Sequence, residues 1–318
     1  MITFSDIERA YKVLQPVVHK TPLLSSRTFN EMTGNQVYFK AENFQRIGAF
    51  KFRGAYNKIA SLSEQERKRG VIAHSSGNHA QGVALASKLF GIKAVVVMPH
   101  NSVVSKVEAT KGYGAEVVFC EDSTDDRERL TDQLIRQRGY TLIHPYQDET
   151  LIAGQGTVAL EIGQELKSLD YLFIPVGGGG LISGCAVAAK HFFPKIKVIG
   201  VETEPANDCY QSFRAKRIIK ITSAKTIADG MRTLSVGTVN FDIIMKYVDD
   251  VITITDDDIY PVIKFFFERM KIVVEPTGAV APAAVMTNTL GLHQKKICAV
   301  ISGGNVDANL FRQILEKS

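Results

Sequence analysis

The sequence has few cysteines and no long apolar run, and both absences limit what the protein can be. Its four cysteines are far apart and form no Cys-x-x-Cys pair, so neither a zinc site nor a disulfide framework is indicated. No stretch approaches the ~20 consecutive apolar residues of a membrane-spanning helix. The N-terminal segment carries acidic residues early and lacks the apolar core of a signal peptide. We therefore expect a cytoplasmic protein with buried thiols and no membrane contact.

Clustered charge is also lacking. The formal net charge is only +5 over 318 residues, and basic residues alternate with acidic ones in stretches such as 125–129. Such alternation is typical of a solvated helix face, whereas a nucleic-acid-binding surface concentrates Lys and Arg. With 45% hydrophobic and 22% charged residues, the chain is long enough to build a substantial core. We expect a folded protein that does not bind nucleic acid.

What the sequence does contain is a regular alternation of short apolar runs and longer helical patterns. From residue 71 the expected strands cover 71–75, 94–98, 116–120 and 141–144, and the expected helices cover 78–90, 103–113 and 125–138. This order predicts an α/β fold in which an open, mostly parallel sheet has helices on both faces.

A second series of the same kind follows. It comprises an expected helix at 154–168 and expected strands at 171–176, 197–202, 250–254 and 296–301. We predict two lobes of this architecture, a small domain at 69–146 and a large domain made of 1–68 and 147–318. In such folds a ligand binds in the crevice at the carboxyl ends of the strands.

Four consecutive glycines, Gly177, Gly178, Gly179 and Gly180, separate an expected strand from an expected helix. Backbone N–H groups clustered at such a junction bind phosphate. A P-loop is excluded because no Lys-Ser or Lys-Thr pair follows the glycines. The dinucleotide fingerprint is incomplete because Ser183 replaces its third glycine, although Glu202 stands at a suitable distance. A nucleotide-dependent oxidoreductase therefore stays open as an alternative.

Lys51 follows a small, flexible lead-in, Gly48-Ala-Phe. A lysine that forms a Schiff base must be neutral part of the time, so burial or neighbouring positive charge has to lower its pKa. The adjacent phenylalanines and Arg53 are candidates for those two effects. A lone lysine at a helix start is usually a surface residue, so the interpretation depends on the other motifs.

Four segments in this order and spacing resemble the serine/threonine dehydratase and serine racemase family of pyridoxal-phosphate enzymes, which have the tryptophan synthase β-like fold. They are 42–54 with Lys51, 75–79 (Ser-Ser-Gly-Asn-His), the glycines 177–180, and 302–305 (Ser-Gly-Gly-Asn). The segments 20–23, 152–157, 226–230 and 274–277 support the match, which covers nearly the whole chain.

The resemblance implies a role for each motif. Lys51 would carry pyridoxal 5'-phosphate, Gly177–Gly180 would hold its phosphate, Asn78 would bond its ring hydroxyl, and Ser302 would face its pyridine nitrogen. Because the segment 75–79 lies at a strand-to-helix junction, its N–H groups suit a substrate carboxylate. The substrate-binding residues expected there are Ser75, Ser76, Gly77, Asn78 and His79.

The implied activity is an ammonia-lyase (dehydratase) reaction. It converts L-serine, L-threonine or a relative such as 3-hydroxyaspartate to a 2-oxo acid and ammonia, with Lys51 as general base. Ser76 matches the racemases' second acid/base, which leaves serine racemase with a dehydratase side activity as an alternative. Arg127 matches an arginine that binds the substrate carboxylate in the racemases.

The resemblance also implies a metal and an effector. Glu202, Asp208 and the carbonyl of Ala206 match a divalent-cation site, and oxygen ligands suit Mg²⁺ or Ca²⁺. Parts of an ATP site match at Ser25, Ser26, Lys106 and Asn305, whereas Arg46 and Ile47 depart from it. Family members are usually homodimers. Feedback inhibition by isoleucine is not expected, because the chain ends soon after Ser302.

Overall fold

The strands of the chain form two sheets. The computed structural model describes residues 1–121 and 123–317. In spatial order, the larger sheet joins β1 (Leu23–Ser25), β2 (Gln36–Ala41), β10 (Lys296–Ile301), β7 (Tyr171–Pro175), β8 (Lys197–Thr203) and β9 (Asp250–Ile254). The smaller sheet joins β5 (Glu116–Cys120), β4 (Ala94–Pro99), β3 (Val71–His74) and β6 (Thr141–Leu142). Neighbouring strands run parallel except β1, which is antiparallel to β2.

The helices fill the intervals between the strands. The α-helices are α1 (Phe4–Leu14), α2 (Arg27–Thr33), α3 (Lys51–Ala60), α4 (Glu64–Arg69), α5 (Asn78–Phe90), α6 (Val104–Gly112), α7 (Thr124–Arg138), α8 (Glu149–Glu165), α9 (Gly180–Phe192), α10 (Asp208–Ala215), α11 (Thr238–Tyr247), α12 (Ile259–Phe265), α13 (Pro276–Met286) and α14 (Ala308–Lys317). Shorter helical turns are η1 (Glu42–Phe44), η2 (Arg46–Gly48), η3 (Asp229–Met231) and the π-helical η4 (Phe266–Met270).

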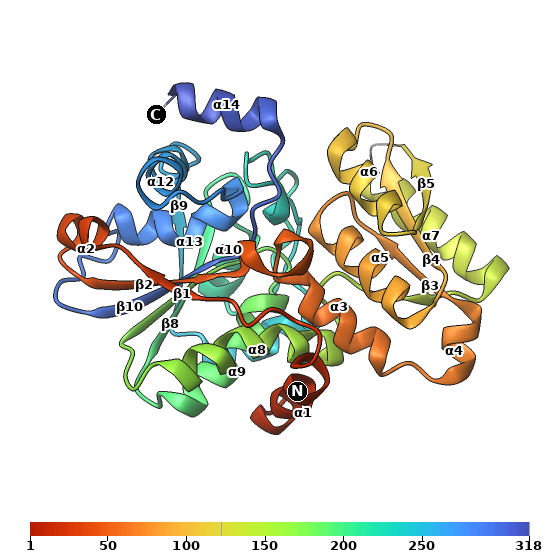
Figure 1. Ribbon diagram of the computed structural model, residues 1–318, viewed down its shortest axis with the longest axis horizontal. Coiled ribbons are helices and arrows are strands. Elements are labelled where there is room, and N and C mark those ends of the chain that lie inside the picture. The colour runs from red at the N-terminus through yellow and green to blue at the C-terminus, as the bar shows by residue number, and fades with distance from the viewer. Residues whose placement is uncertain (122, 318) are drawn as a thin grey trace.

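Both faces of the larger sheet are buried, which explains its continuous apolar strands. Side chains alternate along each strand, so Leu172 and Ile174 of β7 join the apolar cluster with α8 and α9, whereas Phe173 joins the cluster with α12 and α13. Figure 1 shows these two helix pairs on opposite sides of the sheet. The predicted α/β fold with mostly parallel sheets and helices on both faces is confirmed.

The two sheets lie in lobes side by side, with α3 between them (Figure 1). Helix α3 contacts α5 of the smaller lobe and α8 of the larger one. The N-terminal strand β2 pairs with β10, so the start of the chain belongs to the larger sheet. The strands of the smaller sheet fall within 71–142; the domain boundaries at 69 and 146 stay a prediction.

Most expected elements begin and end within a few residues of the observed ones, and helix 154–168 differs most. The observed α8 begins five residues earlier, at Glu149, because the Asp148 side chain caps it by accepting the Leu151 N–H at 2.9 Å. It ends at Glu165, since Leu166 adopts an extended backbone.

Candidate active site

The motifs that are far apart in the sequence meet near the start of α3. The Phe50 N–H donates to the Ser302 carbonyl at 3.1 Å, and Ala49 pairs with Gly303 in an isolated β-bridge. The chain entering α3 therefore lies against the end of β10. This contact places Lys51, the first residue of α3, at the carboxyl edge of the larger sheet.

The Lys51 side chain is largely buried and its ammonium group is not ion-paired in the described structure. Its Nζ donates to the Pro145 carbonyl at 2.8 Å. Burial lowers the pKa of Lys51 to about 8, as expected for a charged group withdrawn from water. The suggestion that Arg53 contributes positive charge is wrong: the Arg53 guanidinium is bound between Glu42 and Glu161, and burial alone accounts for the shift.

The glycine loop packs against the residue that follows Pro145. A side chain on Gly178 would place its Cβ 2.3 Å from the Tyr146 ring, and Gly179 has a φ of 93°, which favours glycine. Gly179 is the N-cap of α9, whose first N–H groups have no acceptor within the helix. The loop thus forms a cradle for an anion, joined to Lys51 through residues 145 and 146.

Ser302 provides the clearest test of whether these residues fit pyridoxal phosphate. Its Oγ is buried and has no hydrogen-bond partner in the described part of the chain. A buried hydroxyl without a partner costs free energy, and a ligand nitrogen would satisfy it. Together with the glycine cradle and the Lys51 amine, this hydroxyl matches the three polar ends of the cofactor.

Asn78 begins α5 and has a fixed side chain. Its Nδ2 donates to Glu275 Oε1 at 2.6 Å, and its Oδ1 accepts from Asn305 Nδ2 at 2.8 Å. Sequence reasoning gave no site role to Glu275, although it lies in one of the supporting segments. Nothing in the sequence connects residues 78 and 275, which only the fold brings together.

The segment 75–79 connects β3 to α5, as expected. The Gly77 N–H donates to the Ser75 hydroxyl at 3.3 Å, while Ser76 is partly exposed. The His79 imidazole is buried, and its Nε2 lies 2.8 Å from the Ile143 carbonyl. The other ring nitrogen, Nδ1, is buried without a hydrogen-bond partner among the described residues, while the backbone N–H of His79 lies in the first turn of α5.

Arg127 lies on α7 of the smaller lobe, close to His74 and Tyr146. Its Nε is buried without a hydrogen-bond partner among the described residues. Burial and then the Arg127 charge lower the pKa of His74 to about 4, so His74 is neutral at physiological pH. Arg127 therefore supplies positive charge next to the segment that follows β3.

The two carboxylates expected to bind a metal are close neighbours. Burial, and then Asp208, raise the pKa of Glu202 well above its ordinary value, and burial raises that of Asp208 to about 7. Glu202 accepts backbone N–H groups from Cys209 and Tyr210, whereas Asp208 Oδ2 is buried without a partner in the described structure. Ala206 lies beside them through its bridge to Thr203.

The residues that match an ATP site are mostly engaged elsewhere. Lys106 forms an ion pair with Asp229, and Asn305 binds Asn78 and Ile47. Ser26 caps α2, and Ser25 ends β1. None of these contacts tests ATP binding, which stays a prediction.

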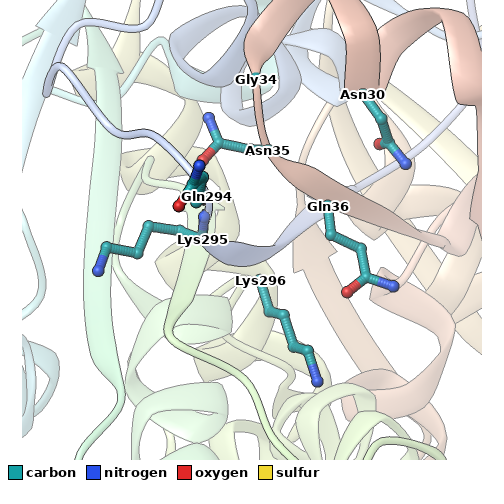
Figure 2. Close-up of a pocket in the computed structure, with 7 residues that line it drawn as sticks. All are labelled: Asn30, Gly34, Asn35, Gln36, Gln294, Lys295 and Lys296. Carbon is teal, nitrogen blue, oxygen red and sulfur yellow. Dashed lines mark hydrogen bonds between the residues drawn. The ribbon is translucent and has the colours of Figure 1, made fainter.

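A surface hollow lies away from this site (Figure 2). Its lining residues are Asn30, Gly34, Asn35, Gln36, Gln294, Lys295 and Lys296. It lies where β2 and β10 begin, at the opposite edge of the sheet from Ser302. Asn35 Nδ2 donates to the carbonyls of Thr33 and Leu292, each at 2.8 Å. These polar groups stabilise the local turns, so we do not assign the chemistry to this hollow.

All four cysteines are buried. Among the helices in the described residues, none has both the length and the apolar composition that crossing a membrane requires.

Comparisons with known proteins identify the family. The model of the family described as "Pyridoxal-phosphate dependent enzyme" matches residues 14–303. The chain is 46% identical to L-threo-3-hydroxyaspartate ammonia-lyase of Saccharomyces cerevisiae, covering 98% of this chain and 96% of the relative. It is also 46% identical to serine racemase of Schizosaccharomyces pombe, covering 99% and 98%. Maize serine racemase superposes with a TM-score of 0.95 at 40% identity, covering 99% and 97%. The chain is therefore an enzyme that belongs to the pyridoxal-phosphate dependent family.

Proposed function

We propose that the protein is an ammonia-lyase that converts β-hydroxylated L-amino acids, namely serine, threonine and 3-hydroxyaspartate, to a 2-oxo acid and ammonia. The water lost in the elimination is regained when the unsaturated amine is hydrolysed, so the reaction is balanced. The observation that carries the proposal is the Lys51 amine, whose pKa of about 8 leaves a substantial neutral fraction at physiological pH. The family membership excludes the oxidoreductase alternative.

In this proposal the protein binds the cofactor at three points. Lys51 attaches it, the N–H groups of Gly177–Gly180 hold its phosphate, and the Ser302 hydroxyl donates to its ring nitrogen. When bound, pyridoxal phosphate supplies an aldehyde that condenses with amines and a ring that stabilises negative charge at the substrate α-carbon. A neutral hydroxyl beside the nitrogen, rather than a carboxylate, leaves the ring unprotonated, which favours elimination over transamination.

The substrate then needs an anion site and a base. The N–H groups at the start of α5, from Ser75 to His79, suit the substrate carboxylate. Lys51 Nζ would accept the substrate α-proton as general base. The lowered pKa of the amine, which burial causes, supports this role.

Serine racemisation is the second candidate, and Ser76 is the observation that favours it. A hydroxyl at this position could donate a proton to the face of the α-carbon opposite Lys51, which would invert the configuration. The similarity to a protein named serine racemase supports this alternative equally. The two activities would share the other residues and diverge once the α-proton is removed: elimination would expel the β-hydroxyl as water, whereas racemisation would return a proton to the opposite face of the α-carbon.

Arg127 bears on the substrate class. A buried guanidinium nitrogen without a partner in the described structure suits a carboxylate. Since the start of α5 already serves one carboxylate, we propose that Arg127 binds the second carboxylate of 3-hydroxyaspartate. The substitution Arg127→Gln should then lower kcat/KM for 3-hydroxyaspartate by at least tenfold more than for L-serine.

One incubation separates these activities. The pyridoxal-phosphate-loaded protein is mixed with Mg²⁺ and L-serine or L-threo-3-hydroxyaspartate, and the 2-oxo acid and D-serine are followed together. Formation of a 2-oxo acid with little D-serine is the expected result. Predominant D-serine, abolished by Ser76→Ala while elimination persists, would make racemisation the main activity. The absence of both products would contradict the proposal.

A further inference from the structure

The side chain of Asn78 is held by two residues from the other lobe, and their contacts determine its orientation. The Ile47 carbonyl can only accept a hydrogen bond, and Asn305 Nδ2 donates to it at 2.7 Å. The Asn305 amide is therefore oriented by the backbone. Its second N–H hydrogen is directed to Asn78 Oδ1 at 2.8 Å.

The orientation of the Asn305 amide in turn determines how Asn78 contacts Glu275. Because Asn78 Oδ1 faces Asn305, Asn78 Nδ2 must face the opposite way, where it donates to Glu275 Oε1 at 2.6 Å. An amide nitrogen has two hydrogens, so one N–H of Asn78 is left for a ligand. In a reversed amide Asn78 Nδ2 would face Asn305 Nδ2, donor against donor, which makes the observed orientation the stable one.

Two further features show that this contact is built into the fold. A Cβ on Gly303 would lie 2.4 Å from Glu275 Oε1 and 3.1 Å from Asn78 Nδ2, so only glycine leaves room for the pair. Ile47, whose carbonyl accepts the hydrogen bond from Asn305 Nδ2, has a φ of 61°. That backbone conformation is strained for a β-branched residue, and the Asn305 amide stabilises it.

The charge state of Glu275 is consistent with this arrangement. Its carboxyl group is buried, and Oε2 has no hydrogen-bond partner in the described residues. Burial is the main cause that raises the pKa of Glu275 to about 8, and Asp229 raises it further, while Lys106 and Asn78 oppose the shift. A neutral carboxyl group accepts one N–H without leaving an unpaired buried charge.

We propose that Glu275 and Asn305 are positioning residues that fix the amide of Asn78, so that its remaining N–H is directed to the bound cofactor. The inference rests on the proposed contact between Asn78 and the cofactor's ring hydroxyl. Asn78 begins the first helix after β3, in the smaller lobe, whereas Glu275 and Asn305 flank helix α13 and strand β10 of the larger one. The orientation of a cofactor ligand is thus set across the two lobes.

The test measures cofactor binding and the visible absorption spectrum of the bound cofactor, which responds to the ring hydroxyl. Glu275→Met and Asn305→Leu remove the acceptor and the donor, and each should weaken pyridoxal phosphate binding about 3- to 10-fold, the effect of one hydrogen bond, with an altered spectrum. Glu275→Gln keeps an acceptor for Asn78 and should stay within about twofold of the wild type. Asn43→Leu is the matched control, because Asn43 Nδ2 also donates to a nearby carbonyl, that of Val273, at 3.2 Å.

The decisive comparison is made in an Asn78→Ala background. If Glu275 and Asn305 act through Asn78, their substitution there changes neither the dissociation constant nor the spectrum further. Additive effects in that background, or single variants with wild-type binding and spectrum, would overturn the proposal. If Glu275→Met does not fold, Asn305→Leu tests the same amide from its other side. A wild-type protein that binds no pyridoxal phosphate would instead refute the proposed function.

Discussion

Replacing Arg53 by methionine should destabilise the protein strongly, because Arg53 is the centre of a buried charge cluster. Lys40, Glu42, Arg53 and Glu161 all have side chains with 0% exposure. The guanidinium donates two hydrogen bonds to Glu42, at 2.8 and 2.9 Å, and two to Glu161, at 2.7 and 2.9 Å. Burial opposes ionisation of Glu42, but Arg53 holds the pKa of Glu42 below its ordinary value.

The magnitude follows from the charge that Arg53→Met leaves behind. The cluster changes from neutral to a net charge of −1, and the remaining cation, Lys40, is ion-paired with Glu161. Removing one partner of a buried ion pair costs about 3–5 kcal/mol. With an unfolding entropy of ~2.1 cal/mol/K per residue over 318 residues, that cost corresponds to a fall in Tm of about 4–8 °C.

Thermal unfolding followed by circular dichroism measures this fall, and two variants control for other causes. Arg53→Met combined with Glu42→Gln restores neutrality and should recover at least half of the lost Tm. Lys68→Met breaks an exposed pair with Glu64 and should change Tm by less than about 1 °C. A Tm for Arg53→Met within 1 °C of the wild type, or a double variant no more stable than the single one, would refute the reasoning.

Three further predictions concern the site. The rate at which the cofactor-free protein combines with pyridoxal phosphate should rise with pH and level off above about pH 8. The reason is that burial gives Lys51 a pKa of about 8 and only the neutral amine reacts. A rate that still rises beyond pH 10 would contradict this. Gly178→Ala should weaken cofactor binding about tenfold or more, since its Cβ would lie 2.3 Å from the Tyr146 ring, whereas Gly112→Ala, which meets nothing within 4 Å, should leave the dissociation constant unchanged. Mg²⁺ or Ca²⁺ should raise Tm, because the adjacent buried carboxyl groups of Glu202 and Asp208 favour a cation. The substitution Asp208→Asn should abolish that rise. Equal Tm values with either cation and with EDTA would count against a metal site.

Periodicity and motif order predicted much of this protein. Strand 116–120 and helix 78–90 were placed correctly because local apolar spacing determines them. The start of α8 was missed, since the cap at Asp148 precedes the apolar pattern. Strand β2 was not among the predicted strands, and its parallel partner β10 follows more than 250 residues later.

For the residues with a chemical role, those in contiguous motifs were predicted, whereas contacts made by tertiary structure were not. Lys51 and the glycines 177–180 stand in contiguous motifs, so the sequence alone was enough to single them out. The contact of Glu275 with Asn78 depends on tertiary structure, as does the buried position of Arg53 between two carboxylates. Local sequence does not encode which distant polar groups become partners, and that is where prediction failed.

Borohydride reduction of the pyridoxal-phosphate-loaded protein, followed by peptide mass spectrometry, tests the central claim most directly. Reduction fixes the cofactor to the lysine that carries it. We predict a single modified peptide with the group on Lys51, and loss of that modification in Lys51→Ala. A cofactor fixed to another lysine, or none fixed while the cofactor is bound, would contradict the account.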